Sequence, residues 1–190
     1  MLIVFRRVTN GCSFSHSIGF GTRMSLTHND AALGRIKLLS LDVDGVLTDG
    51  GIYYADDGNT YRKFNAKDGM GLVHLMKSGI QVTLISAGAP GAIEHRAKRL
   101  GIEHVFTNIH DKLTVLRQLC DDLDINMEDV AHMGDDINDL SIMDHVGLSI
   151  TVADAVDAVL QVADITTKRK GGEGAVREIC DAVIRLNTPA

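Results

Sequence analysis

Two aspartates directly follow an early, mostly apolar stretch of the chain. The stretch spans residues 36–41, and Asp42, Val43, Asp44 and Gly45 come next. A short apolar run of this kind is typical of a strand buried on both faces of a parallel sheet. In such sheets the chemistry lies beyond the carboxyl ends of the strands. Asp42 and Asp44 could supply a carboxylate nucleophile, an acid/base and a ligand for a hard cation, whereas the same residues could also form an ordinary turn.

Three further polar groups occupy comparable places along the chain. Ser86 follows the apolar run at residues 80–85, and Asp135 follows the one at residues 130–133 within Gly134-Asp135-Asp136. Lys112 lies at the start of a predicted helix. Because the carboxyl ends of parallel strands meet at one edge of a sheet, this order favours a reaction site over an isolated turn.

The elements that must position these groups alternate between strand and helix. Apolar runs predict strands at residues 36–42, 80–85, 104–107, 130–133, 148–150 and 163–166. Between and after them, patterns and capping residues predict helices that start at Asp68, near Pro90, at Asp111, near Leu140, at Ala155 and after Gly174. This alternation predicts an α/β fold with a doubly wound parallel sheet.

One short insertion interrupts the alternation directly after the two aspartates. Residues 50–55 and 60–64 are rich in aromatic and β-favouring residues and flank Asp56-Asp57-Gly58-Asn59. Two such runs around a Gly/Asn/Asp turn predict a β-hairpin, which we interpret as a small flap. The chain offers no other insertion long enough to form a cap domain.

The motif at residues 42–50, Asp-Val-Asp-Gly-Val-Leu-Thr-Asp-Gly, resembles motif I of the haloacid dehalogenase (HAD) superfamily phosphatases. It is most similar to the small capless branch that contains 3-deoxy-D-manno-octulosonate 8-phosphate (KDO 8-P) phosphatase, and the resemblance extends over residues 36–186. It implies a HAD-like Rossmannoid fold with Asp42 as nucleophile and Asp44 as acid/base. It also implies a Mg²⁺ site formed by Asp42, the backbone carbonyl of Asp44, and Asp135.

The same resemblance gives roles to the other polar groups. Ser86 would hydrogen-bond the phosphoryl group, and Lys112 would offset the negative charge around the nucleophile. Asp139 occupies the second acidic position of the motif that starts at Gly134, although an Asp there is also a common helix cap. Lys112 at a helix start could equally be a solvated side chain. We assign no catalytic role to any of the eight histidines.

Two basic segments also resemble parts of this capless branch. The first is the segment at residues 67–71, in which Lys67 could face the phosphate. The second is the tail at residues 168–178, whose cations Lys168, Arg169, Lys170 and Arg177 could meet a sugar-acid carboxylate. The alternative is a solvated basic turn before an amphipathic helix. The resemblance further implies a homotetramer in which flap and tail help to close a neighbour's site.

One departure from the branch concerns substrate choice. The branch usually continues motif II as Ser/Thr-Gly-Arg, whereas this chain reads Ser86-Ala87-Gly88-Ala89-Pro90. We therefore expect a KDO 8-P phosphatase and keep a nonulosonate 9-phosphate phosphatase as the alternative. A receiver-like regulatory module and a non-catalytic phosphate-binding subunit are other classes that combine similar residues, but the flap and the Gly134-Asp135 motif speak against a receiver.

Composition limits the partners. Sixteen basic residues against 25 acidic ones follow Arg23, so residues 24–190 carry a net charge of −9. This acidic balance argues against nucleic acid or an anionic membrane as partner. The three cysteines form no CxxC pair, which favours a reducing compartment, and we expect a cytoplasmic protein. No apolar run has the roughly 18 residues that a membrane span needs.

The first residues differ in composition from the rest. Residues 1–23 contain serine and arginine but no acidic residue, as organelle transit peptides do, whereas the simpler interpretation makes Met24 the initiator. We predict that residues 1–35 form an N-terminal extension that is disordered or not translated, and that the phosphatase domain spans residues 36–190.

Overall fold

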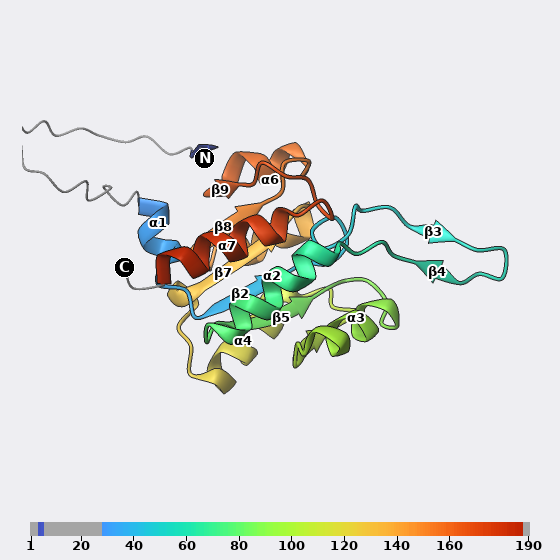
Figure 1. Ribbon diagram of the computed structural model, residues 1–190, viewed down its shortest axis with the longest axis horizontal. Coiled ribbons are helices and arrows are strands. Elements are labelled where there is room, and N and C mark those ends of the chain that lie inside the picture. The colour runs from blue at the N-terminus through green and yellow to red at the C-terminus, as the bar shows by residue number, and fades with distance from the viewer. Residues whose placement is uncertain (1–3, 6–27, 188–190) are drawn as a thin grey trace, which may run out of the picture.

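A seven-stranded sheet forms the centre of the molecule (Figure 1). The structure is a computed structural model, and it describes residues 4–5 and 28–187. The strands of the sheet lie in the order β1-β9-β8-β7-β2-β5-β6, and all neighbours are parallel except β1 and β9. Their bounds are β1 Val4–Phe5, β2 Leu38–Leu41, β5 Gln81–Ile85, β6 His104–Phe106, β7 Val130–Gly134, β8 Leu148–Thr151 and β9 Ile165–Thr166.

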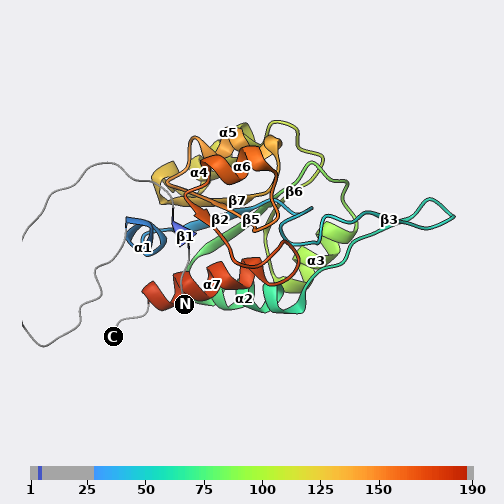
Figure 2. The same cartoon turned by 90° about the horizontal axis from the view of Figure 1, so that it is seen from above.

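Helices cover both faces of this sheet (Figure 2). Helices α4, α5 and α6 lie on one face, and α2, α3 and α7 lie on the other. Their bounds are α2 Ala66–Lys77, α3 Ala92–Leu100, α4 Lys112–Leu123, α5 Leu140–Met143, α6 Asp157–Val162 and α7 Ala175–Asn187. Single 3₁₀ turns at Met127–Asp129 and Ile137–Asp139 flank β7. This three-layer arrangement confirms the predicted doubly wound α/β fold.

The order of the strands fixes where a ligand can bind. The strand β2 has β5 on one side and β7 on the other, with Leu41 opposite Leu84 and Met133 respectively. Counted along the chain, the six parallel strands therefore have the order 3-2-1-4-5-6, which reverses direction between β2 and β7. Ligands in such sheets bind in the crevice beyond the carboxyl ends of the strands at this switch point. Asp42 and Asp135 follow the two strands that form it.

The strand β2 is buried on both faces, as its apolar sequence predicts. Leu39 and Leu41 belong to the larger hydrophobic cluster of the protein. Leu38 belongs to a second cluster together with Leu116 and Leu119 of α4. None of these leucines is more than 4% exposed, so β2 is held firmly from both sides and presents its carboxyl end in a fixed position.

The predicted flap is a short hairpin that extends away from the body of the molecule (Figure 1). Its strands are β3 (Tyr53–Tyr54) and β4 (Thr60–Tyr61), which pair antiparallel. A further bridge between Thr48 and Phe64 closes its base. The hairpin is therefore confirmed, with paired segments shorter than the aromatic runs that predicted it. Among the described residues, no other insertion resembles a cap domain.

The start of the folded body differs from the prediction. Helix α1 (His28–Leu33) precedes residue 36, and its Ala32 and Leu33 are buried in the main hydrophobic cluster. The strand β1 pairs with β9 at the edge of the sheet. The boundary at residue 36 is thus too late, because residues before it complete the core. Met24, the predicted alternative initiator, lies outside the described residues.

The start of α2 also differs from the prediction. Asn65, not Asp68, is its N-cap residue, and the Asn65 side chain accepts a hydrogen bond from the backbone N–H of Lys67. Asp68 is fully buried and accepts hydrogen bonds from the backbone N–H groups of Gly174 and Arg177 at 3.2 and 2.8 Å. It therefore caps the start of a different helix, α7, a contact that local sequence cannot reveal. Within the described ranges, no helix combines the length and apolar character that crossing a membrane requires.

Candidate active site

Asp42 is the first residue after β2, and the residue is almost fully buried, at 5% exposure. Its backbone N–H donates to the carbonyl of Met133 at 2.9 Å, which extends the pairing with β7. Its Oδ1 accepts from the N–H of Val43 at 2.7 Å, and its Oδ2 lies 2.9 Å from Lys112 Nζ. Burial and the charge of Asp139 raise the pKa of Asp42 to about 6, against the lowering effect of Lys112.

Lys112 is the first residue of α4, and its side chain is fully buried rather than solvated. The loop that leads to it is fixed to the Ser86 loop, because Asn108 and Ile109 donate backbone hydrogen bonds to the carbonyls of Gly88 and Ser86. Lys112 Nζ also lies 2.7 Å from Asp139 Oδ1. Burial lowers the pKa of Lys112, but the charges of Asp42 and Asp139 outweigh it and raise the pKa overall. A permanent positive charge therefore lies beside the proposed nucleophile.

Asp139 organises this part of the site. Its Oδ1 accepts from Lys112 and lies 3.2 Å from His132 Nε2, and its Oδ2 accepts from the backbone N–H of Asp135 at 3.2 Å. Burial alone would raise the pKa of Asp139, but His132 and Lys112 lower it below its usual value. Asp139 also takes part in the capping box of the 3₁₀ turn. The two interpretations of this residue, helix cap and member of the acidic motif, therefore both describe it.

His132 is a residue that sequence reasoning missed. It lies in the middle of β7, is fully buried, and its Nδ1 lies 3.0 Å from Ser40 Oγ while Nε2 contacts Asp139. The available signal was a titratable residue inside an otherwise apolar strand. Such a residue must find a partner when buried, and here the partner is an acid of the site.

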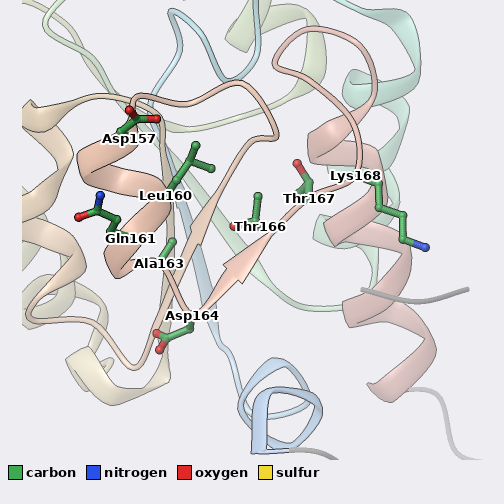
Figure 3. Close-up of a pocket in the computed structure, with 8 residues that line it drawn as sticks. All are labelled: Asp157, Leu160, Gln161, Ala163, Asp164, Thr166, Thr167 and Lys168. Atoms are coloured by element: carbon green, nitrogen blue, oxygen red, sulfur yellow. The ribbon is translucent and has the colours of Figure 1, made fainter. Parts of the chain in front are cut away.

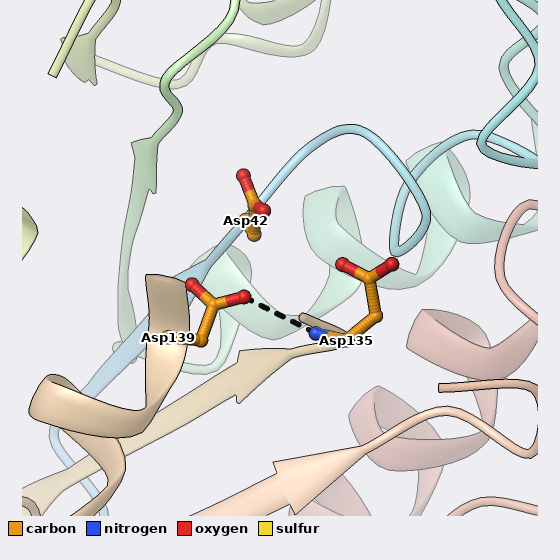
Figure 4. Close-up of side chains that lie close together, drawn as sticks. All are labelled: Asp42, Asp135 and Asp139. Atoms are coloured by element: carbon orange, nitrogen blue, oxygen red, sulfur yellow. Dashed lines mark hydrogen bonds between the residues drawn. The ribbon is translucent and has the colours of Figure 1, made fainter. Parts of the chain in front are cut away.

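Asp135 and its neighbours form a group with the character of a metal site (Figure 4). One carboxylate oxygen from each of Asp42, Asp135 and Asp139 lies within 4.8 Å of the others. Among the described residues, Asp135 Oδ1 is the one buried side-chain oxygen or nitrogen atom without a hydrogen-bond partner. Burial and the charges of Asp42 and Asp139 raise the pKa of Asp135 to about 7. A buried carboxylate oxygen that accepts no hydrogen bond is free to act as a ligand for a cation.

Charge and space both fit Mg²⁺. Three carboxylates and Lys112 leave two negative charges, which one divalent ion neutralises. All the donors are oxygens, as hard cations require. Gly45, with φ of +89°, keeps the space beside Asp135 open, because a Cβ there would overlap the Asp135 carboxylate. Mg²⁺ is the cofactor that this site fits, and Asp42 and Asp135 are the side chains that the resemblance predicts would hold it. Asp139 accepts hydrogen bonds from Lys112 and from the backbone N–H of Asp135.

The carboxylate of Asp44 contacts the base of the flap. Arg62 donates to it from two nitrogens, at 2.7 and 3.1 Å. Arg62 had no signal in the sequence, because the contact depends on how the flap returns to the body. The backbone carbonyl of Asp44 stays a predicted metal ligand. Ser86, almost fully buried, accepts from the N–H of Gly88 at 3.0 Å and follows β5, the neighbour of β2.

The predicted substrate-binding cations come together in part. Lys67, Lys168, Arg169 and Arg177 line a cavity of about 400 Å³ with Gly174, Glu178 and Asp181, whereas Lys170 does not line it. The tail is fixed to the motif I loop of its own chain, because Gly172 donates to the carbonyl of Val46 at 3.0 Å and a Cβ at Gly171 would overlap the Gly45 carbonyl. That the tail reaches Asp42 of a neighbouring subunit stays a prediction.

A second cavity, of about 480 Å³, lies between α6 and β9 (Figure 3). Its polar lining includes Asp157, Asp164 and Lys168. Asp164 is already engaged, because it accepts hydrogen bonds from the backbone N–H and the hydroxyl of Ser149 at 3.0 and 2.7 Å. None of the predicted catalytic residues lines this cavity, so we assign the reaction to the switch point between β2 and β7.

Comparison with known proteins agrees with this geometry. A model of the haloacid dehalogenase-like hydrolases matches residues 99–179. The 3-deoxy-D-manno-octulosonate 8-phosphate phosphatase of Yersinia pestis is 43% identical over 149 residues, which are 78% of this chain and 80% of that protein.

Solved structures show the same relationship. The Y. pestis enzyme superposes with a TM-score of 0.82 at 40% identity, over 83% of this chain and 85% of that one. The Moraxella catarrhalis enzyme, solved with magnesium, phosphate and KDO, gives a TM-score of 0.81 at 37% identity, over 83% and 90%. The chain therefore belongs to the haloacid dehalogenase-like hydrolases, as a phosphatase of the branch that contains the 3-deoxy-D-manno-octulosonate 8-phosphate phosphatases.

Proposed function

We propose that this enzyme hydrolyses a sugar-acid phosphate, KDO 8-phosphate, to KDO and phosphate through an aspartyl-phosphate on Asp42. The observation that carries the proposal is the pairing of the buried Asp42 carboxylate with Lys112, beside an unpartnered oxygen of Asp135. This arrangement provides a nucleophile, a fixed cation and a place for Mg²⁺. The similarity to an enzyme solved with magnesium, phosphate and KDO supports the choice of substrate.

The reaction has two steps. In the first, an Asp42 oxygen attacks phosphorus, the bond from phosphorus to the sugar oxygen breaks, and Asp44 gives its proton to that oxygen. In the second, Asp44 takes a proton from water, the water oxygen attacks phosphorus, and the bond from phosphorus to the Asp42 oxygen breaks, which frees the Asp42 carboxylate and inorganic phosphate. Bound Mg²⁺ would supply positive charge to the phosphoryl oxygens.

Lys112 and Ser86 support both steps. Lys112 lies 2.9 Å from Asp42 and keeps that buried carboxylate charged and oriented. Its charge is fixed before the reaction starts, so it costs no reorganisation when negative charge moves toward the phosphoryl group. The Ser86 hydroxyl can donate a hydrogen bond to a phosphoryl oxygen while it accepts from Gly88.

The alternative substrate, a nonulosonate 9-phosphate, follows from motif II. This loop contains Ala87, Gly88 and Ala89 where the branch usually has Gly-Arg. The guanidinium beside Gly88 belongs to the flap residue Arg62, because a Cβ at Gly88 would lie 2.7 Å from Arg62 Nη2, but it is paired with Asp44. The motif II loop itself therefore offers no cation to the sugar. Recognition of the sugar beyond the phosphate can therefore differ from that of the branch.

The experiment compares kcat/KM for KDO 8-phosphate and N-acetylneuraminate 9-phosphate with Mg²⁺, for the wild type and Asp42→Asn. We expect KDO 8-phosphate to be preferred and the variant to be inactive on both. A higher kcat/KM for the 9-phosphate would show that the alternative compound, and not KDO 8-phosphate, is the substrate. An Asp42→Asn enzyme with activity within about tenfold of wild type, roughly 1.4 kcal/mol of barrier, would overturn the mechanism.

We also propose that the enzyme is a cytoplasmic homotetramer. A capless site needs a neighbour to shield it from water, and the flap carries exposed Tyr53, Tyr54 and Tyr61 at 48%, 75% and 58% exposure. Aromatic side chains are common at subunit interfaces. Light scattering tests the tetramer: a monomeric mass at full activity would show that one chain completes the site.

A further inference from the structure

The base of the flap brings a guanidinium onto the proposed acid/base. Arg62 Nε lies 2.7 Å from Asp44 Oδ1, and Arg62 Nη2 lies 3.1 Å from Asp44 Oδ2. The Arg62 side chain is only 12% exposed and that of Asp44 is 31% exposed. Two hydrogen bonds from one guanidinium to the two oxygens of a carboxylate fix its plane as well as its position.

The chain around Arg62 is held on both sides. The strand β4 ends at Tyr61, one residue before it, and the Thr48–Phe64 bridge follows two residues later. Arg96 of α3 lies over the Phe64 ring, 5.8 Å from its centre, and donates to the carbonyl of Asn65 at 3.0 Å. The flap tip extends away from the body, but the residue that reaches Asp44 stands at its anchored base.

The Ser86–Gly88 loop also lies against the Arg62–Asp44 ion pair. A Cβ at Gly88 would lie 2.7 Å from Arg62 Nη2 and 2.7 Å from Asp44 Oδ2. The Asp44 carboxylate is therefore confined between the flap and the loop that carries Ser86. Because Asp44 Oδ1 has the shorter contact, Oδ2 is the oxygen that is easier to free for a leaving group.

We propose that Arg62 is a positioning residue for Asp44: it holds Oδ1 and so directs Oδ2 toward the leaving oxygen of the substrate. This inference rests on the acid/base role of Asp44 in the proposed function. It makes the flap a determinant of the chemical step, because movement of the flap base would misalign the acid. It also predicts that the effect depends on how much the leaving group needs a proton.

The test compares Arg62→Met and Arg62→Lys with Lys63→Met. Lys63 is the neighbouring flap cation, is 62% exposed, and makes its own ion pair with Asp49 at 3.1 Å, so its variant controls for loss of a flap charge. A sugar alkoxide needs a proton to leave, whereas p-nitrophenolate does not. The comparison uses kcat/KM, which reports on the steps up to departure of the leaving group and not on the later attack of water, which is common to both substrates. We expect Arg62→Met to lower kcat/KM for KDO 8-phosphate roughly ten- to hundredfold, part of the 10²–10⁴ that general acids contribute, and to lower kcat/KM for p-nitrophenyl phosphate much less.

The conservative variant tests the geometry. Lysine keeps the charge but cannot form the two-nitrogen fork. We expect Arg62→Lys to recover only part of the activity that Arg62→Met loses. Full recovery would mean that charge alone matters, and equal losses of kcat/KM on both substrates would mean that Arg62 does not act through proton transfer to the leaving group. Either result would overturn the inference.

A double-mutant cycle with Asp44→Asn separates Arg62 from a role in binding the sugar. If Arg62 acts through Asp44, Arg62→Met should cause no further loss in the Asp44→Asn enzyme. If Arg62 touches the substrate directly, the two losses should multiply, and the inference fails. Asp42→Asn reports separately on the proposed function: when it is inactive and Arg62→Met behaves as wild type, only the inference about Arg62 is wrong.

Discussion

Replacement of Lys112 by Met tests the electrostatic core of the site. The change keeps the length of the side chain and removes one buried charge that contacts two carboxylates, Asp42 at 2.9 Å and Asp139 at 2.7 Å. Neither Lys112 nor Asp139 is exposed. The removal of one partner from a buried ion pair costs about 3–5 kcal/mol, because the remaining charge stays buried without compensation.

That loss is a large share of the stability of an ordinary domain, which is about 5–15 kcal/mol. At about 2–4 °C per kcal/mol for a chain of this size, it lowers the midpoint of thermal unfolding by about 6–20 °C. Loss of a preorganised charge beside the reacting group should also lower kcat by about 10²–10³. The destabilisation should be smaller at pH 5 than at pH 8, because the buried carboxylates can then take up protons instead of remaining charged.

The assay is denaturant unfolding of the metal-free protein at both pH values, together with kcat in Mg²⁺. The matched control is Lys37→Met, since Lys37 is 58% exposed and pairs with Asp129 at 2.8 Å. An exposed pair of this kind contributes about 0–1 kcal/mol. If Lys112→Met is no more destabilising than Lys37→Met, or keeps activity within about tenfold of wild type, the reasoning about the buried charge is wrong.

Three further predictions concern the metal and the tail. In the metal-free protein the pKa values of Asp42 and Asp135 are raised to about 6 and about 7, so protonation of these residues stabilises the folded state. The free energy of unfolding of the metal-free protein should therefore fall as pH rises from about 4 to about 7. Mg²⁺ should restore it with release of protons, measurable by calorimetry in two buffers; binding without proton release would contradict this. Gly45→Ala should weaken Mg²⁺ binding by at least about tenfold, because the added Cβ would overlap the Asp135 carboxylate. Gly58→Ala, at a similar φ but with open space around it, should leave Mg²⁺ binding unchanged. Equal affinities of the two variants would show that Gly45 does not keep space for the metal. Alanine at residues 168–170 should lower kcat/KM for the sugar phosphate more than for p-nitrophenyl phosphate, and equal effects would remove the tail from substrate recognition.

The sequence by itself determined the fold class, the flap and the places of the main polar groups. Alternation of strands and helices specifies a parallel sheet, because each apolar run needs cover on both faces. A parallel sheet then brings the residues after β2 and β7 to one edge. Because both rules depend only on the sequence near each strand, the order of Asp42, Ser86 and Asp135 after apolar runs, together with the family resemblance, was enough to name them as candidates.

Contacts between segments far apart in the chain were decided only by the tertiary structure. His132 meets Ser40 and Asp139, Arg62 meets Asp44 across the flap, and Asp68 caps α7 rather than its own helix. The start of the folded body was also misjudged, because Leu33 is buried by elements that follow much later in the chain. Local sequence patterns indicate which polar side chains an element carries. The hydrogen-bond partner of each side chain depends on how the elements pack, because a buried polar group is satisfied by whatever donor or acceptor the fold brings within reach.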